Sequence, residues 1–144
     1  MMLKFLLAVD GSPASNMAIS GFVRILDWYK ERPEIHLLNV QLPERGNVPL
    51  FIDKESIDLY HREEGMKDLQ VARELLCKAD IPCHIHITVG DPAEMILRYA
   101  EESGCDQIVI GPRGLGPVKG FFLGSVASKV MKFSTLPVLL LTRQ

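Results

Sequence analysis

A glycine-rich stretch near the end of this chain has the residue types that hold an anion. The segment "GPRGLGPVKGFFLGS", Gly111 to Ser125, contains five glycines and two cations, Arg113 and Lys119, and no carboxylate. It follows a strand-like apolar run and precedes a helical pattern, so Gly124 and Ser125 would open a helix whose first N–H groups favour a phosphate. The segment predicts a phosphate-binding loop, with an ordinary flexible connection as the alternative.

The glycines suggest how such a loop would work. We expect Gly111 and Gly114 to adopt backbone angles closed to other residues, so that successive N–H groups surround one anion. The chain contains neither G-x-x-x-x-G-K-[ST] nor G-x-G-x-x-G, so it carries neither the Walker motif nor the dinucleotide motif. The loop is therefore predicted from its composition and its place between a strand and a helix.

The elements that position this loop alternate along the sequence. Short apolar runs typical of strands occupy residues 3–9, 34–40, 82–89, 106–110 and 137–142, and helical patterns lie between them. Strands that alternate with helices indicate right-handed crossovers. The sequence predicts an α/β fold, a single open sheet of five mainly parallel strands with helices on both faces.

Local signals place the helix starts. Ser12 followed by Pro13, and Asp91 followed by Pro92, are typical of N-caps. The first helix should run to about residue 30, with Trp28 in the core or at the helix end. One continuous helix is expected over residues 55–80, weakened by Gly65.

Open parallel sheets bind ligands beyond the carboxyl ends of their strands, where the winding reverses. The loops after the first and fourth strands are therefore the candidates, and the first contains Asp10. Asp10 is either a ligand-binding carboxylate or a turn residue before Gly11.

Composition limits the function classes. The 144 residues have a net charge of −2, with 47% hydrophobic and 24% charged residues, which is typical of one soluble domain, here residues 1–144. No nucleic-acid or membrane partner is expected. The apolar start of the chain ends at Asp10, which is too short for a secretory signal. The three widely spaced cysteines favour reduced thiols in the cytoplasm.

His84 and His86 share one face of the strand expected at residues 82–89, a spacing that two zinc ligands could use. Cys83 lies on the opposite face, and no nearby carboxylate supplies a third ligand. We interpret both histidines as polar residues on a partly exposed face, and expect no metal site.

Several segments together resemble a known family. The spacing Gly111-x-x-Gly114, nine residues, Gly124-Ser125 resembles the G-2x-G-9x-G-[ST] signature of the ATP-binding branch of universal stress proteins. "LLAVDGSPAS", "HLLNV" and "LPVLLLTR" are similar to that family's first, second and closing strands. The resemblance covers essentially the whole chain. It implies a Rossmann-like sheet of strand order 3-2-1-4-5, which places Asp10 opposite the glycine loop.

The resemblance also implies a site. ATP, with Mg²⁺ as a candidate companion ion, would bind with the ribose at Asp10, which could instead hold the ion, and with the adenine at the backbone of Val40. The nucleotide-binding residues implied are Ala8, Val9, Asp10, Val40, Ile110, Gly111, Arg113, Gly114, Gly124, Ser125 and Val126. Pro112 departs from the Ser or Thr often found there, and removes a hydroxyl and a backbone donor.

Three functions follow from these features. The first is an ATP-binding regulatory or stress-response module with little or no hydrolysis, because the loop lacks a positioned base. The second is a slow ATPase or nucleotidyl transferase that uses Glu44 or Asp53 from the connection at residues 41–53. The third is a nucleotide-free scaffold. The apolar last strand, Val138 to Leu141, predicts a homodimer paired through that strand.

Overall fold

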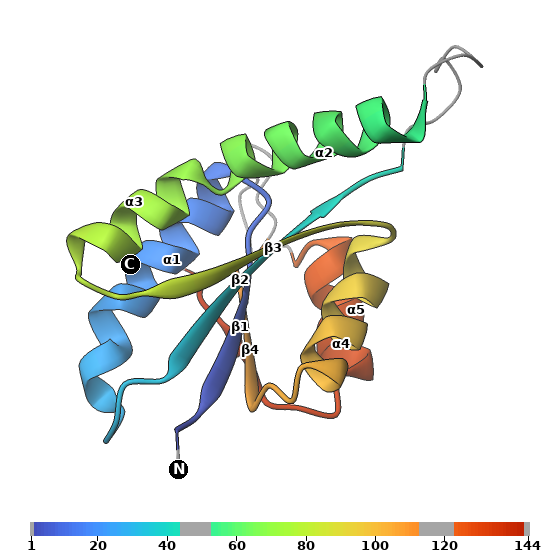
Figure 1. Cartoon of the computed structure of the whole chain (residues 1–144). Helices are drawn as coiled ribbons and strands as arrows, with labels where there is room; N and C mark the ends of the chain where they lie inside the picture. The colour runs from blue at the N-terminus through green and yellow to red at the C-terminus, as the bar shows by residue number, and fades with distance from the viewer. Residues whose placement is uncertain (1, 44–52, 113–122, 143–144) are drawn as a thin grey trace.

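Five parallel strands form the centre of the structure, a computed structural model that describes residues 2–43, 53–112 and 123–142. The strands are β1 (Lys4–Ala8), β2 (Glu34–Gln41), β3 (Cys83–Val89), β4 (Gln107–Ile110) and β5 (Val138–Leu140). They pair in the order β3-β2-β1-β4-β5, and every pair is parallel (Figure 1). The predicted fold class and the strand order implied by the family resemblance are both confirmed.

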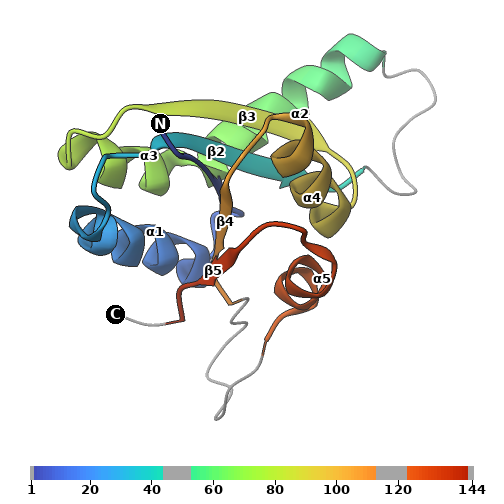
Figure 2. The same cartoon turned by 90° about the horizontal axis from the view of Figure 1, so that it is seen from below.

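Helices cover both faces of the sheet (Figure 1). One face carries α1 (Pro13–Ile25), α2 (Lys54–Asp68) and α3 (Gln70–Lys78), and the other carries α4 (Pro92–Glu102) and α5 (Ser125–Phe133). Figure 2 shows α4 and α5 next to each other on one side of β4 and β5. No helix in the described segments is long and apolar enough to cross a membrane.

The central strand β1 separates two hydrophobic cores. Phe5 and Leu7 pack toward α1 and α3, whereas Leu6 packs toward α4 and α5. All three side chains are at most 1% exposed. Because successive side chains of a strand point to opposite faces, a continuous apolar run is what a strand buried on both faces requires.

The predicted helix starts are confirmed. The Ser12 hydroxyl accepts a hydrogen bond from the Ser15 N–H at 3.2 Å, with Pro13 as the first helical residue. The Asp91 carboxylate accepts one from the Glu94 N–H at 3.0 Å. Each cap satisfies a first-turn N–H that the helix itself leaves unpaired, so these two loop–helix junctions have a defined geometry.

The single helix expected over residues 55–80 is wrong. The segment forms two helices, and the break lies at Leu69 rather than at Gly65. Gly65 stays within α2 for a packing reason, because a Cβ there would lie 2.7 Å from Ile87 Cγ2. Glycine thus lets α2 approach β3 more closely than any other residue would.

Trp28 does not pack into the core, contrary to the expectation from the sequence. Helix α1 ends at Ile25, and a short 3₁₀ helix over Leu26–Trp28 turns the tryptophan outward, where it is 80% exposed. Tyr29 packs instead, with its ring centroid 5.0 Å from that of Phe5.

Candidate functional site

A cavity of about 490 Å³ lies at the carboxyl ends of β1, β2 and β4, where the two halves of the sheet diverge. This is the position at which open parallel sheets bind ligands, and the volume lies within the range of small-molecule sites. Its described lining residues are Ala8, Val9, Asp10, Gly11, Ser12, Ser15, Leu38, Val40, Leu42, Pro92, Ile96, Ile110, Gly111, Pro112, Val126 and Ala127.

Most of the site residues inferred from the sequence come together here. Ala8, Val9, Asp10, Val40, Ile110, Gly111 and Val126 all line the cavity. Gly124 and Ser125 do not line it but begin α5 immediately before Val126. Arg113, Gly114, Lys119 and Glu44 lie outside the described residues. The structure therefore brings the Asp10 loop, the end of β4 and the start of α5 to one place.

Helix α4 contributes wall residues that the sequence did not indicate. Pro92 and Ile96 close the cavity from the α4 side, and Leu38 forms part of the β2 wall. In the sequence, Ile96 occupies a position of the helical pattern after Asp91 that a core-facing residue would also occupy. A residue that faces a core and one that faces a cavity carry the same signal, so only the structure separates them.

The loop after β1 is a tight turn around Asp10. Asp10 Oδ1 accepts a hydrogen bond from the Ser12 N–H at 2.9 Å, and the Asp10 N–H donates to Ser15 Oγ at 3.2 Å. Gly11 has a φ of +81°, which favours glycine. The turn role of Asp10 is confirmed. The hydrogen bond from Ser12 occupies one of the roughly four lone pairs of the Asp10 carboxylate. The turn role and a ligand role are therefore compatible.

Asn39, Gln41 and Asp68 form a polar network beneath this loop, which nothing in the sequence indicated. Asn39 is 1% exposed and donates through Nδ2 to the Val9 carbonyl at 2.9 Å and to Asp68 Oδ2 at 3.2 Å. Gln41 Nε2 donates to Asn39 Oδ1 at 2.7 Å and to Asp68 Oδ2 at 3.0 Å. The network ties the end of β1 to β2 and to the last residue of α2, so it fixes the backbone that leads into Asp10.

The expected role of Gly111 is wrong. The glycines with positive φ are Gly11, Gly90 and Gly104 in the described part of the chain, so Gly111 does not adopt an angle closed to other residues. This position has no room for a side chain because α1 packs against it. A Cβ at this position would lie 3.0 Å from both the Ala14 carbonyl oxygen and Ala18 Cβ.

Val40 presents its backbone to the cavity. The Val9 N–H donates to the Leu38 carbonyl at 2.9 Å, while the Gly90 N–H donates to the Gln41 carbonyl at 2.9 Å. Successive residues of a strand point their polar backbone groups to alternate sides. The N–H and C=O of Val40 therefore point to the same side as those of Leu38, toward β1. The pairing of β1 with β2 ends at Ala8 and Leu38, so Val40 lies beyond the paired residues.

The start of α5 has the geometry expected for anion binding. Gly124 is its N-cap, with φ −63° and ψ 161°, and no side chain makes a capping hydrogen bond there. Helix starts carry unpaired N–H groups and a partial positive charge. Because Val126 and Ala127 line the cavity, this helix start lies beside it.

Asp53, one of the two candidate bases, serves as a helix cap. Its Oδ1 accepts a hydrogen bond from the Ser56 N–H at 2.8 Å at the start of α2. Hydrogen bonds from Ser56 hold the pKa of this carboxyl below its ordinary value, and a weaker base abstracts a proton less readily. Asp53 is not among the described residues that line the cavity.

The interpretation of His84 and His86 needs a correction. We expected no carboxylate nearby, but Glu34 Oε1 lies 3.6 Å from His84 Nε2. The sequence concealed this contact because Glu34 and its neighbour His36 belong to β2, which pairs with β3.

Comparison with known proteins identifies the family. The sequence profile of the Universal stress protein family matches residues 1–142. The chain belongs to that family. Universal stress protein YxiE of Bacillus subtilis is 32% identical over 145 residues, covering 95% of this chain and 97% of the relative.

Solved structures share the fold of this universal stress protein. Protein MJ0577 of Methanocaldococcus jannaschii superposes with a TM-score of 0.75 at 27% identity, covering 100% of this chain and 98% of the other. An Arabidopsis thaliana family protein with AMP bound gives a TM-score of 0.71 at 21% identity, covering 99% and 92%. The resemblance noted in the sequence is thereby confirmed.

Proposed function

We propose that this chain is a single-domain cytoplasmic module that binds an adenine nucleotide, ATP, in the 490 Å³ cavity, and that it acts by binding rather than by hydrolysis. The observation that carries the proposal is the meeting of the Asp10 turn, the β2 backbone at Val40 and the start of α5 at one switch point. Support comes also from the Arabidopsis relative that contains AMP.

The cavity offers a distinct environment to each part of a nucleotide. Leu38, Ile96 and Ile110 supply apolar walls for the adenine ring, and the N–H and C=O of Val40 can recognise its polar edge. The Asp10 carboxylate, which still has lone pairs after its bond to Ser12, accepts from ribose hydroxyls. The phosphates lie at the start of α5, where the helix N–H groups point.

The described lining residues contain no candidate for an in-line base. Asp10 is their one charged residue, and it is engaged in the turn at the ribose end of the site. A helix start stabilises phosphate in the ground state and the transition state alike, and such uniform binding does not raise turnover. We therefore expect turnover far below the roughly 1–100 s⁻¹ of kinases.

Calorimetry on a Gly124→Val variant tests the phosphate position. The backbone angles of Gly124, φ −63° and ψ 161°, are open to valine, whose side chain would obstruct the first-turn N–H groups. Gly124 is buried, so circular dichroism must first verify that the variant is folded. Losing one hydrogen bond to a charged group costs about 1.5–3 kcal/mol, so ATP should bind at least about tenfold more weakly. Ser128→Val adds the same side chain at an exposed position further along α5 and should leave the affinity unchanged. Equal ATP affinity in both variants would contradict the assignment.

The hydrolysis alternative has its own assay. A single-turnover measurement with ATP and Mg²⁺, on protein free of contaminating ATPases, should show only slow product formation. Fast turnover that Asp53→Asn or Glu44→Gln abolishes would make the chain an enzyme. Asp53→Asn retains an oxygen that can cap α2, so loss of turnover in that variant would not reflect loss of the helix.

We further propose that two copies pair through β5. This strand lies at the edge of the sheet, and Val138, Leu139 and Leu140 are each only partly buried by the chain itself. Edge strands of this kind pair with a second chain, and a two-fold axis would bring two β5 strands together. Sedimentation at micromolar concentration should give a dimer, and a monomer alone would contradict the pairing.

A further inference from the structure

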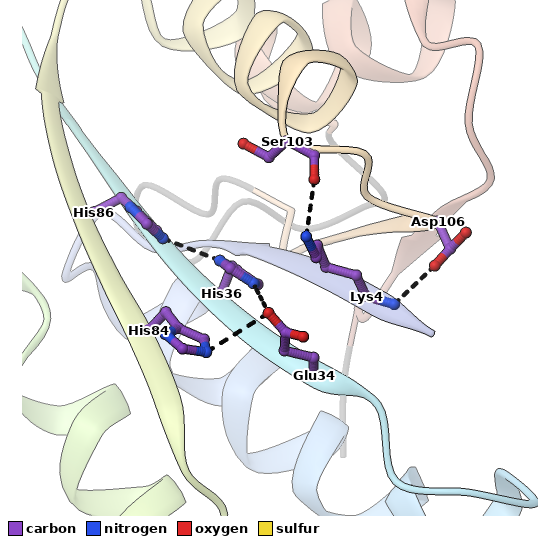
Figure 3. A network of polar contacts seen from close by, with 7 residues as sticks. All are labelled: Lys4, Glu34, His36, His84, His86, Ser103 and Asp106. Carbon is purple, nitrogen blue, oxygen red and sulfur yellow. Dashed lines mark hydrogen bonds and ion pairs between the residues drawn. The ribbon is translucent and has the colours of Figure 1, made fainter. Parts of the chain in front are cut away.

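Three histidines and a glutamate gather on one face of the β2–β3 strand pair. The strand register places His36 directly beside His84. Glu34 precedes His36 by two residues on β2, and His86 follows His84 by two on β3, so all four side chains point to the same face. Figure 3 shows the four side chains directed toward one another. The cluster arises from two segments that the sequence separates by about 50 residues.

The polar atoms of this cluster converge. Glu34 Oε1 lies 2.6 Å from His36 Nε2 and 3.6 Å from His84 Nε2. The three ligand atoms, one from each residue, all lie within 4.8 Å of one another. On its other side, His36 Nδ1 lies 3.0 Å from His86 Nε2. The Glu34 carboxylate thus faces two imidazole nitrogens, and His36 is held at both of its nitrogens.

Burial differs among these side chains in a way that suits a metal site. The His36 side chain is 10% exposed, whereas Glu34 and His84 are 36% and 60% exposed. The buried imidazole gives a fixed anchor, and the two exposed ligands leave an approach for an ion and a water molecule.

Lys4, which pairs with Glu34 in the register of β1 and β2, is held by other partners. Lys4 on β1 donates through Nζ to the Ser103 carbonyl at 3.0 Å, and its main-chain N–H donates to Asp106 Oδ2 at 2.8 Å (Figure 3). The ion pairs of Glu34 are with His36 and His84 in the described residues. The carboxylate is therefore available to an added cation.

We propose that Glu34 Oε1, His36 Nε2 and His84 Nε2 bind a divalent first-row transition metal ion, with Zn²⁺ as the reference ion and water at the fourth position. Zinc–ligand bonds of about 2.0–2.2 Å in a tetrahedron place ligand atoms about 3.3 Å apart. The separations of Glu34 Oε1 from the two nitrogens, 2.6 and 3.6 Å, lie on either side of that value. The His36 and His84 rings are stacked, with centroids 4.7 Å apart, so the exposed His84 ring must turn to direct its Nε2 lone pair at the ion. Two imidazoles with one carboxylate suit zinc, copper or nickel, whereas Mg²⁺ prefers oxygen alone.

His86 acts as a positioning residue for His36. When His36 Nε2 binds the ion, its proton lies on Nδ1, which donates to His86 Nε2 across the 3.0 Å contact. Histidines that bind metals usually donate their second ring N–H in this way. The His86 ring stacks on the His36 ring with centroids 5.2 Å apart, and its centroid lies 4.6 Å from that of Tyr99. These two contacts fix its orientation.

This site is separate from the proposed nucleotide cavity. Glu34 and His36 lie at the start of β2, and the cavity is lined from Leu38 and Val40 onward. Leu38, the first cavity residue on β2, lies about 7 Å further along the strand than His36, and none of Glu34, His36, His84 and His86 is among the described residues that line the cavity. Failure of nucleotide binding and failure of metal binding are therefore distinguishable results.

Zinc titration by calorimetry tests the proposal. The protein should carry no histidine tag and no nucleotide, be treated with a chelator, and contain Cys77→Ser to remove its exposed thiol. We expect uptake of one Zn²⁺ per chain that millimolar Mg²⁺ does not displace. Glu34→Gln and His84→Asn should each weaken zinc binding at least about tenfold. Both residues are more than a third exposed, so the fold should be retained, which circular dichroism verifies.

A matched control and a spectroscopic readout complete the design. Glu64 is also 36% exposed and paired with one cation, Lys67, so Glu64→Gln should leave zinc binding unchanged. In the wild type, zinc should place the His36 proton on Nδ1 in ¹⁵N imidazole spectra. His86→Gln should weaken zinc about 10–100-fold and alter that signal. No uptake of one equivalent, equal affinity in Glu34→Gln and Glu64→Gln, or competition by Mg²⁺ would each overturn the proposal.

Discussion

Removal of the Asn39 side chain should destabilise the whole protein, because Asn39 links three elements beneath the proposed site. Asn39→Ala leaves the Val9 carbonyl without its 2.9 Å donor and Asp68 Oδ2 without one of its two donors. It also leaves Gln41 Nε2 without the Asn39 oxygen at 2.7 Å. All three losses occur around a residue that is 1% exposed.

The size of the effect follows from these contacts. A neutral hydrogen bond contributes about 1 kcal/mol net, and one to a charged group about 1.5–3 kcal/mol. With one neutral and one charged bond donated and one accepted, Asn39→Ala should lower the free energy of unfolding by about 3.5–5 kcal/mol. For a chain of this size, that lowers Tm by about 12–17 °C.

Urea unfolding should be followed by circular dichroism at 222 nm. Trp28 fluorescence is a poor probe because this tryptophan is already 80% exposed in the folded chain. Asn16→Ala is the matched control, since Asn16 makes one long hydrogen bond, 3.4 Å to the Gly11 carbonyl. We expect that variant to change stability by less than about 0.5 kcal/mol.

A double-mutant cycle tests whether the network acts as a unit. Asn39 and Asp68 share a direct bond and the common partner Gln41. The double variant should therefore lose at least about 0.5 kcal/mol less stability than the two single Ala variants lose together. A cost below about 1 kcal/mol for Asn39→Ala, or strict additivity with Asp68→Ala, would refute this account of the loop.

Three further perturbations have defined outcomes. Gly65→Ala should lower the free energy of unfolding by about 1–3 kcal/mol, because the added Cβ would lie 2.7 Å from Ile87 Cγ2. This clash should outweigh the better helix propensity of alanine. A higher urea midpoint would contradict this. Gly111→Ala should also destabilise the folded protein, because the added Cβ would lie 3.0 Å from the Ala14 carbonyl oxygen and α1 would have to shift. An unchanged thermal midpoint would count against this prediction. Burial lowers the pKa of His86, so the unfolded chain takes up that proton first, and stability falls as the pH drops below about 6.5. In His86→Gln, urea midpoints should fall less between about pH 7 and pH 5.5, and an identical decline would exclude this contribution.

The elements that local chemistry specifies were predictable from the sequence. The cap at Ser12 is set within four residues, and the buried strand β1 is set by its own apolar run. The meeting of the Asp10 loop with the end of β4 followed from the switch-point rule and from the family resemblance. The cap and the strand need no knowledge of contacts between distant segments, and the switch-point rule supplies the one long-range meeting from topology alone.

The features that the sequence did not reveal depend on contacts between distant segments. Gly65 and Gly111 looked like a helix breaker and a flexible loop residue, but both are small because another element packs against them. Asp68 meets Asn39 only after α2 folds over β2. Glu34 reaches His84 only through the pairing of β2 with β3. Residue type alone cannot identify a partner about 50 positions away.

Backbone amide spectra during an ATP titration locate the bound nucleotide on the chain. Binding at the switch point should shift the amide resonances of Val9, Val40, Gly111 and Val126, which line the cavity, while those of Glu34 and His84 at the other end of β2 and β3 stay in place. Saturation with these residues shifted would support binding at the switch point. Absence of shifts at millimolar ATP, or shifts confined to residues outside the cavity, would contradict it.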